Sequence, residues 1–299
     1  IDGQASNENW WWMNGNPGYG WREGMNNQKL SGRKQLLAFE QNRTPVEERR
    51  FGIEGALRPQ LVNLNNCNTV LIEDLTLKNS PFWVIHPVRT DNFILRGVTI
   101  ISAGPNSDGC HPESCNGVLI ENCYFDTGDD CIAIKSGRNN DGRRWSIPSQ
   151  NIIVRNCRMA DGHGGVVIGS EISGGFSNLF VEDCEMDSPE LLRVIRIKTS
   201  DCRGGVVENV NVRNVKVGKC SEAVLKINLM YEPGEECDRS FPPFVRGVTL
   251  ENVTSEESHY GICIIGLDES VNVSGITLRN CSFNGVQEGT SITGAEDVK

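Results

Sequence analysis

The stretch Asn116-Gly117-Val118-Leu119-Ile120-Glu121-Asn122-Cys123 is one copy of an eight-residue pattern that recurs along the chain. Positions three, five and eight are apolar in every copy, and position seven is always Asn, Asp or Gly. This alternation predicts a strand with one buried face, and the residue types at position seven tolerate the left-handed backbone of a tight corner. The copies begin at Asn68, Asp91, Asn116, Gln150, Ser177, Glu208, Arg246 and Ser274.

The distance between copies predicts how the strands are arranged. The shortest step, from residue 68 to 91, is 23 residues, and the longest, from 208 to 246, is 38 residues. A sandwich would place strands every ~8–12 residues without a long-range repeat, and a leucine-rich repeat needs a Leu-x-x-Leu-x-Leu frame that is missing. We therefore predict an all-β fold, a right-handed parallel β-helix in which each coil contributes about three short strands.

Length and charge limit the class of protein. The 299 residues carry a net charge of −10, which argues against nucleic acid or an anionic membrane as partner. No stretch resembles a transmembrane helix or a signal peptide. Because the repeat runs through most of the chain, we expect one catalytic β-helix domain over residues 1–299. The chain opens at Ile1 without an initiator Met and ends, at Glu296–Lys299, like half of another repeat. We therefore expect a fragment lacking one or both end caps, from a secreted or periplasmic protein.

The twelve cysteines fall into two groups. Those at the eighth repeat position alternate with Leu and Val in other copies, so we interpret them as buried free thiols of a stacked core. They are Cys123, Cys157, Cys184 and Cys281. Outside this column, Cys110 with Cys115, and Cys220 with Cys237, are candidates for disulfides. The sequence contains no Cys-x-x-Cys pair, so we do not expect a zinc site.

Two of the steps between copies are lengthened by insertions. Residues 136–149 carry Arg138, Arg143, Arg144 and Trp145, and residues 220–244 carry Tyr231. Because such loops leave the cylinder of a solenoid, we expect both insertions to form walls of a cleft.

Chemically distinctive residues recur at a similar phase of four consecutive copies. Counting from each repeat start, we place them in the strand that follows the repeat strand, where they form a row of roughly 15 Å across four coils. They are Asp108, the pair Asp129 and Asp130, His163, and the pair Arg196 and Lys198.

The two ends of this row suit different parts of an acidic substrate. Strand alternation buries Ile195 and Ile197 and sends Arg196 and Lys198 outward together, where they can bind a carboxylate. At the other end, three clustered carboxylates raise the pKa of one of them and keep a proton available near neutral pH. We expect Gly128 to bend the backbone before the Asp pair. His163, between glycines, is open to interpretation as a turn residue, although its place in the row favours function.

At these residues the chain resembles the polygalacturonase family, glycoside hydrolase family 28. Four signatures of the family occur in order, as Asn106-Ser107-Asp108, Gly128-Asp129-Asp130, Gly162-His163-Gly164 and Arg196-Ile197-Lys198. The opening Ile1-Asp2-Gly3-Gln4 and Trp10–Trp12 also resemble a family segment near the first coils. The run from Ser80 to Pro87 resembles the bacterial and plant exo-type branch, which favours exo action over endo action.

The resemblance implies hydrolysis of α-1,4-galacturonosidic bonds in pectin with inversion and without metal or other cofactor. It implies that Asp129 is the general acid, that Asp108 and Asp130 activate the attacking water, and that His163 supports the acid. Arg196 and Lys198 would bind the galacturonate carboxylate, with Asn106 a further substrate-binding residue. An inverting acid and base should lie roughly 6.5–9.5 Å apart. The resemblance leaves open whether Tyr231 or Tyr260 is the tyrosine that many endo-acting relatives carry after the Arg-x-Lys pair.

Two other functions remain as alternatives. A pectate lyase would share the fold and substrate but would use calcium and an arginine base for β-elimination, so chelation would abolish its activity. A non-catalytic β-helix, such as an adhesin or another carbohydrate binder, would bind the oligosaccharide without cleaving it, and it would have no reason to align Asp108, Asp129, Asp130 and His163.

Overall fold

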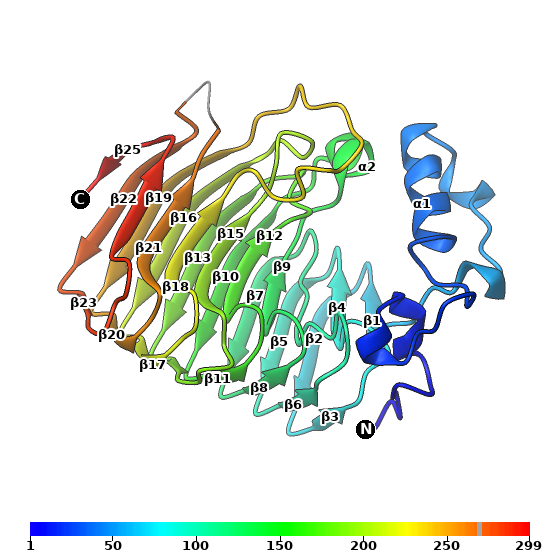
Figure 1. Cartoon of the computed structure of the whole chain (residues 1–299), viewed down its shortest axis with the longest axis horizontal. Coiled ribbons are helices and arrows are strands. Elements are labelled where there is room, and N and C mark those ends of the chain that lie inside the picture. The colour runs from blue at the N-terminus through cyan, green and yellow to red at the C-terminus, as the bar shows by residue number, and fades with distance from the viewer. Residues whose placement is uncertain (268–270) are drawn as a thin grey trace.

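The computed structural model describes residues 1–267 and 271–299, which form a stack of parallel strands preceded by an N-terminal lobe (Figure 1). The eight repeat strands and one more strand form a nine-stranded parallel sheet. Its members are β2 (Asn68–Glu73), β5 (Asp91–Arg96), β7 (Asn116–Glu121), β10 (Ser149–Arg155), β13 (Phe176–Glu182), β16 (Val206–Arg213), β19 (Phe244–Glu251), β22 (Val273–Arg279) and β25 (Ala295–Val298). The predicted right-handed parallel β-helix is confirmed.

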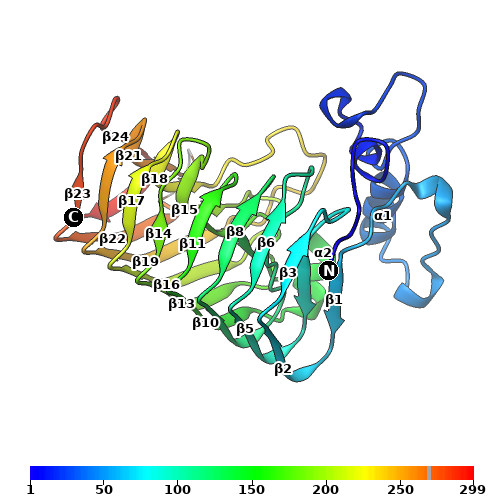
Figure 2. The same cartoon turned by 90° about the horizontal axis from the view of Figure 1, so that it is seen from below.

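Two further walls complete each coil (Figure 2). The second wall contains β3 (Thr76–Lys78), β6 (Thr99–Ser102), β8 (Tyr124–Thr127), β11 (Arg158–Asp161), β14 (Glu185–Met186), β17 (Lys216–Lys219), β20 (Thr254–Glu257) and β23 (Ser282–Phe283). The third wall contains β1 (Val62–Asn65), β4 (Ile85–Val88), β9 (Ile132–Ile134), β12 (Val166–Gly169), β15 (Arg193–Lys198), β18 (Ala223–Asn228), β21 (Tyr260–Ile265) and β24 (Thr290–Thr293). Single bridges from Ile85 to Cys110 and from Cys110 to Ile132 join β4 to β9.

The corners of the coils follow the sequence pattern. Every residue at position seven has a positive φ, from 49° at Asn280 to 61° at Gly97. Every residue at position two is also left-handed, from Thr69 to Gly275. The sequence analysis missed this second corner. Asparagines at position two stack as a ladder, in which Asn151, Asn178 and Asn209 each donate a side-chain hydrogen bond to the preceding coil. These bonds satisfy amide groups along the outside of the stack.

The interior is filled by residues at repeat positions three, five and eight. Phe93, Leu95, Ile120, Val154 and Val212 are at most 1% exposed. Among the cysteines at position eight, Cys123, Cys157 and Cys184 are buried free thiols, as predicted, and Cys281 in the last coil is half-buried. Removal of this apolar surface from water stabilises the stack.

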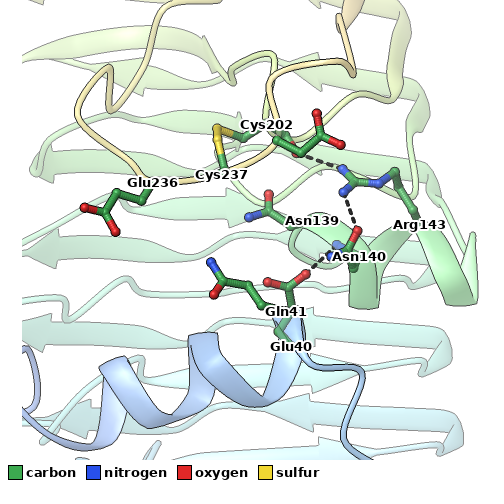
Figure 3. Close-up of a pocket in the computed structure, with 9 residues that line it drawn as sticks. Glu40, Gln41, Asn139, Asn140, Arg143, Cys202, Glu236 and Cys237 are labelled. Carbon is green, nitrogen blue, oxygen red and sulfur yellow. Dashed lines mark hydrogen bonds between the residues drawn. A yellow bond between two sulfur atoms is a disulfide. The ribbon is translucent and has the colours of Figure 1, made fainter.

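The predicted disulfides are wrong. Cys237 pairs with Cys202, 35 residues earlier (Figure 3). Cys110, Cys115 and Cys220 are buried and free. Cys110 lies within the bridge between β4 and β9, and Cys220 follows β17. Both thiols therefore pack in the stacked core and form no disulfide. The bond ties residues 229–243 to the segment after β15.

We expect the Cys202–Cys237 bond to stabilise the protein measurably. A loop of 35 residues corresponds to about 4 kcal/mol of unfolding free energy in the chain-entropy account. Replacing both cysteines by serine should therefore lower the Tm, measured by circular dichroism. Dithiothreitol should lower the Tm of the parent protein but not that of the double variant, because the other ten cysteines are free. Equal Tm values for both proteins would contradict this expectation.

The N-terminal lobe covers one end of the stack (Figure 1). It contains η1 (Trp11–Asn14), η2 (Pro17–Tyr19), α1 (Gly32–Gln41), η3 (Val46–Glu48) and η4 (Ile53–Gly55). The sequence analysis did not foresee α1, because the strand repeat begins only after it. Asp2 forms a parallel bridge with Lys78, which confirms that the opening segment lies beside the first coils. No helix in the described residues is long and apolar enough to span a membrane.

The first insertion folds as α2 (Asn139–Trp145), which lies beside α1 in Figure 1. The backbone N–H of Asn140 donates to Glu40 Oε1 over 2.7 Å, and Arg49 binds Asp141 with both terminal nitrogens, at 2.6 and 3.1 Å. These contacts pin the N-terminal lobe to the loops of the β-helix, and the bidentate arginine fixes their relative orientation.

Candidate active site

The chemically distinctive residues lie at the third wall, one strand further along each coil than predicted. Asp129 and Asp130 fall between β8 and β9, and His163 falls between β11 and β12. Arg196 and Lys198 lie within β15. The prediction was wrong because the strands of the second wall have only two to four residues, so the chain reaches the third wall sooner than expected.

The three carboxylates form a compact cluster. One oxygen each of Asp108, Asp129 and Asp130 lie within 4.8 Å of one another. This separation is shorter than the 6.5–9.5 Å expected for an inverting acid and base. Adjacent coils meet here, since the N–H of Gly109 donates to the carbonyl of Asp130 over 3.0 Å. The crowding therefore follows from strand stacking.

Glycines bring the backbone of neighbouring coils close to the cluster. Gly128 does not bend the chain through a positive φ. A Cβ there would lie 2.4 Å from the carbonyl oxygen of Gly104. A Cβ at Gly162 would lie 2.7 Å from the carbonyl oxygen of Asp129, and one at Gly164 would lie 3.2 Å from Asp130 Oδ1. These three positions need glycine because a side chain there would come too close to atoms of the neighbouring coil.

Two cations compensate the charge of the innermost carboxylate. Asp130 is fully buried; Lys198 Nζ lies 2.6 Å from its Oδ2 and Arg196 Nη1 lies 3.4 Å from its Oδ1. Burial alone would lower the pKa of Lys198, but the nearby Asp130 raises it above the ordinary value. Both oxygens of Asp130 thus have cationic partners from the protein itself, and the sequence analysis had assigned these cations to the substrate alone.

Asp129 is the most accessible of the three carboxylates, with 17% of its side chain exposed. His163 Nδ1 lies 3.2 Å from its Oδ1, and the side-chain amide of Asn106 donates to its Oδ2 over 3.3 Å. Burial alone would raise the pKa of Asp129, but the His163 hydrogen bond and the charge of Lys198 outweigh it and hold the pKa below the ordinary value. These partners therefore favour the charged form of Asp129.

Asn106 connects the cluster to the N-terminal lobe. Its Oδ1 accepts hydrogen bonds from Arg58 Nη2 at 2.7 Å and from Asn14 Nδ2 at 3.0 Å. Arg58 is buried and also donates to the carbonyls of Pro81 and Pro105. The Asn106 amide, predicted to bind substrate, thus donates to Asp129 and is itself held by Arg58 and Asn14. Sequence patterning gave no signal for Arg58.

Asp108 is the carboxylate with a raised pKa. Burial, and then the charges of Asp129 and Asp130, raise its pKa well above the ordinary value. His111 Nδ1 lies 3.3 Å from its Oδ2, and burial lowers the pKa of His111 well below the ordinary value, so the imidazole is neutral. The ring of His111 stacks on Trp83 at 3.6 Å between centroids. Asp108 thus lies beside the stacked rings of His111 and Trp83.

The sequence analysis missed one cation of this face. Lys135 Nζ lies 2.7 Å from Glu171 Oε2 and donates to the carbonyl of Gly169. The alternation that sent Arg196 outward also predicts an outward Lys135, since Ile132 and Ile134 are buried. The two candidate tyrosines differ in position. The Tyr231 ring lies 5.4 Å from the Arg196 guanidinium and 5.3 Å from Lys198 Nζ, whereas Tyr260 packs against His259.

We expect activity to fall on the alkaline side as His163 loses its proton. The hydrogen bond with Asp129 raises the pKa of His163 above 6.5. A raised pKa means that the imidazolium is fully present below the ordinary value and is lost as pH rises through the raised one. The pH profile of kcat/KM should therefore bend downward above pH 6.5. A His163→Gln variant should lack this bend, and an unchanged alkaline limb in the variant would exclude His163 as its source.

Comparison with known proteins identifies the family. Residues 48–298 match the family described as glycosyl hydrolases family 28. The chain belongs to this family. It is 32% identical over 231 residues to a probable polygalacturonase of Vitis vinifera, covering 76% of this chain and 46% of that protein. It is 26% identical over 252 residues to an exo-poly-alpha-D-galacturonosidase of Dickeya chrysanthemi, covering 80% and 41%.

A solved structure of the family is very similar. The hyperthermoactive exopolygalacturonase of Thermotoga maritima superposes with a TM-score of 0.92 at 41% identity, covering 96% of this chain and 64% of that one. The polygalacturonase of Erwinia carotovora ssp. carotovora gives a TM-score of 0.68 at 25% identity, covering 81% and 60%. The chain spans about half the length of the curated relatives that it matches.

Proposed function

We propose that this chain is the catalytic β-helix of an exo-acting polygalacturonase that hydrolyses α-1,4-galacturonosidic bonds of pectin. The observation that carries the proposal is the buried contact between the carboxylate cluster and the Arg196–Lys198 pair on one wall of a family 28 β-helix. Cations and general acid–base groups for an acidic sugar thus meet at one place. The 41% identity to an exopolygalacturonase supports exo action.

Asp129 is proposed as the general acid because it is the carboxylate that reaches the surface. It would give its proton to the glycosidic oxygen as the bond from C1 to that oxygen breaks. His163 and Lys198 favour its charged form before substrate binds. A galacturonate carboxylate bound beside Lys198 would offset that charge, and the bound sugar would displace water; both effects raise the pKa of Asp129 toward that of a proton donor.

Asp108 and Asp130 are proposed to hold the attacking water. Asp130 would accept a proton from the water as the water oxygen bonds to C1. Asp130, whose two oxygens contact Lys198 and Arg196, would orient the water in a charged form. Asp108 keeps the cluster from carrying three negative charges. His163 would support the acid.

We propose inversion of the anomeric centre, as the family resemblance implies. The oxygen separation below 4.8 Å alone would favour retention, for which the carboxyl groups lie ~5–5.5 Å apart. Proton NMR of the first product formed from an α-linked oligogalacturonate decides between the two. The β anomer should appear first, and an initial α anomer would overturn the inverting mechanism.

The function is tested by product analysis on galacturonan. An exo enzyme releases one small product from the start, whereas an endo enzyme gives a ladder of oligosaccharides. Because Asp130 already has cationic partners, we expect EDTA to leave the rate unchanged. A rate abolished by EDTA, with an unsaturated product, would indicate the lyase. Binding without cleavage would indicate the carbohydrate binder.

We also propose that the protein acts in a secreted or periplasmic setting. The Cys202–Cys237 disulfide supports this, because disulfides persist in oxidising compartments. Pectin is an extracellular polymer, so the proposed substrate and the disulfide both support a location outside the cytoplasm.

A further inference from the structure

A cavity lies at the end of the third wall that is opposite the carboxylates. It has a volume of about 990 Å³ and opens between the N-terminal lobe, the ends of β1 and β4, and α2. Its walls come from residues 36–49, from the corners at 65, 88–89 and 113–114, and from residues 136–147. This volume suits a small ligand. The Glu40–Asn140 and Arg49–Asp141 contacts hold the walls together without a ligand.

An exposed tryptophan lines this cavity. Trp145, the last residue of α2, is 54% exposed. The guanidinium carbons of Arg89 and Arg144 lie 5.2 and 5.4 Å from its ring centroid. Both guanidinium groups lie over the indole ring, so this part of the cavity combines an apolar ring surface with cationic hydrogen-bond donors. A pyranose ring bearing a carboxylate presents a matching apolar face and a matching charge.

The charges of the cavity favour an acidic ligand. Its lining includes five arginines, Arg43, Arg49, Arg89, Arg138 and Arg144, and four carboxylates, Glu40, Glu47, Glu113 and Asp141. By count the lining has one positive charge in excess, but Arg138 pairs with glutamates outside it, so attraction for an acid comes from the arginines without a carboxylate partner.

Two of these arginines are available to a ligand. Arg49 and Arg144 pair with Asp141, and Arg138 pairs with glutamates outside the cavity. Within residues 1–267 and 271–299, neither Arg43 nor Arg89 has a carboxylate oxygen within 4.0 Å. The Arg89 guanidinium donates one hydrogen bond, to Asn65 Oδ1 over 3.5 Å, and its other N–H groups can bind a carboxylate.

We propose that this cavity is a distal subsite that binds a uronate residue of the same polysaccharide chain whose end is cleaved at Asp129. The proposal rests on the proposed function. Five residues of chain separate Asp108 from Glu113, which lines the cavity, so these two points are at most about 18 Å apart. A short oligosaccharide spans that distance. The uronate ring would stack on Trp145, and its carboxylate would pair with Arg89.

The test is the dependence of activity on substrate length. We expect kcat/KM to rise from digalacturonate to longer oligogalacturonates, and we expect Trp145→Ala to reduce this preference about tenfold, equivalent to about 1.4 kcal/mol. Trp145→Phe should retain most of it. Phe180→Ala is the matched control, because Phe180 is 37% exposed on β13, in the nine-stranded sheet. The control should behave as the parent protein does.

The charge is tested separately. Arg89→Ala should weaken the length preference on galacturonate oligomers more than on their methyl esters. If Trp145→Ala and Arg89→Ala both keep the parent's length preference, the cavity is not a subsite and the proposal is overturned, while the proposed function stands.

Binding provides a second readout that does not need turnover. In an Asp129→Asn background, calorimetry with longer oligogalacturonates should show a Kd about tenfold higher when Trp145 is also replaced by Ala. An unchanged Kd would count against the subsite. If the parent protein fails to cleave galacturonan while this Kd difference appears, the proposed hydrolase function fails and the acidic-sugar site is retained.

Discussion

Replacing Asp129 by Asn should reduce kcat by about 10²–10⁴-fold, because it removes the proposed proton donor and little contact surface. Binding of oligogalacturonate should remain, since Arg196 and Lys198 are untouched. The kinetics on galacturonan and the Kd from calorimetry measure the two effects separately. A variant that keeps more than about a tenth of kcat would exclude Asp129 as the general acid.

The structure supplies a matched control for this variant. Asp126 lies on β8, three residues earlier, as a half-buried carboxylate outside the cluster of Asp108, Asp129 and Asp130. Asp126→Asn makes the same chemical change with no contact to Asp108, Asp130 or His163, so it should keep parent activity. A comparable loss in Asp126→Asn would indicate that the change acts through stability.

Replacing Lys198 by Ala should have the second largest effect, on both activity and stability. Lys198 is the closer of the two cations on the fully buried Asp130, at 2.6 Å. Removing one partner of a buried ion pair costs about 3–5 kcal/mol of unfolding free energy. Loss of the carboxylate contact to substrate should lower kcat/KM by a further ~10–150-fold, which corresponds to ~1.5–3 kcal/mol. Urea unfolding and steady-state kinetics measure the two losses.

A second variant separates the two roles of Lys198. In Lys198→Ala with Asp130→Asn, the uncompensated charge is gone, so most of the stability should return while activity stays low. The substrate provides the other control, because a methyl-esterified oligomer gains less from a cation and should lose less. Equal losses on acid and ester would mean that Lys198 serves Asp130 alone.

The sequence alone determined the coils and most of the residues at the site. Alternation at repeat positions three and five fixed the buried face, and Asn, Asp or Gly at position seven fixed the corner, because both depend on local backbone geometry. The buried free thiols of Cys123, Cys157 and Cys184 followed from their exchange with aliphatic residues. The family signatures then identified the residues of the carboxylate cluster, although the local sequence did not predict the distances between them.

Tertiary structure alone decided which groups meet across coils and loops. Cys202 is bonded to Cys237, and Arg58 reaches Asn106 from the N-terminal lobe, through chain segments that carry no repeat. The pairing of Lys198 with Asp130 and the raised pKa of Asp108 likewise depend on stacking distance and burial. Local sequence encodes the strand and the corner, whereas the folded path of the insertions sets the contacts between distant residues, and these contacts set charge and protonation at the site.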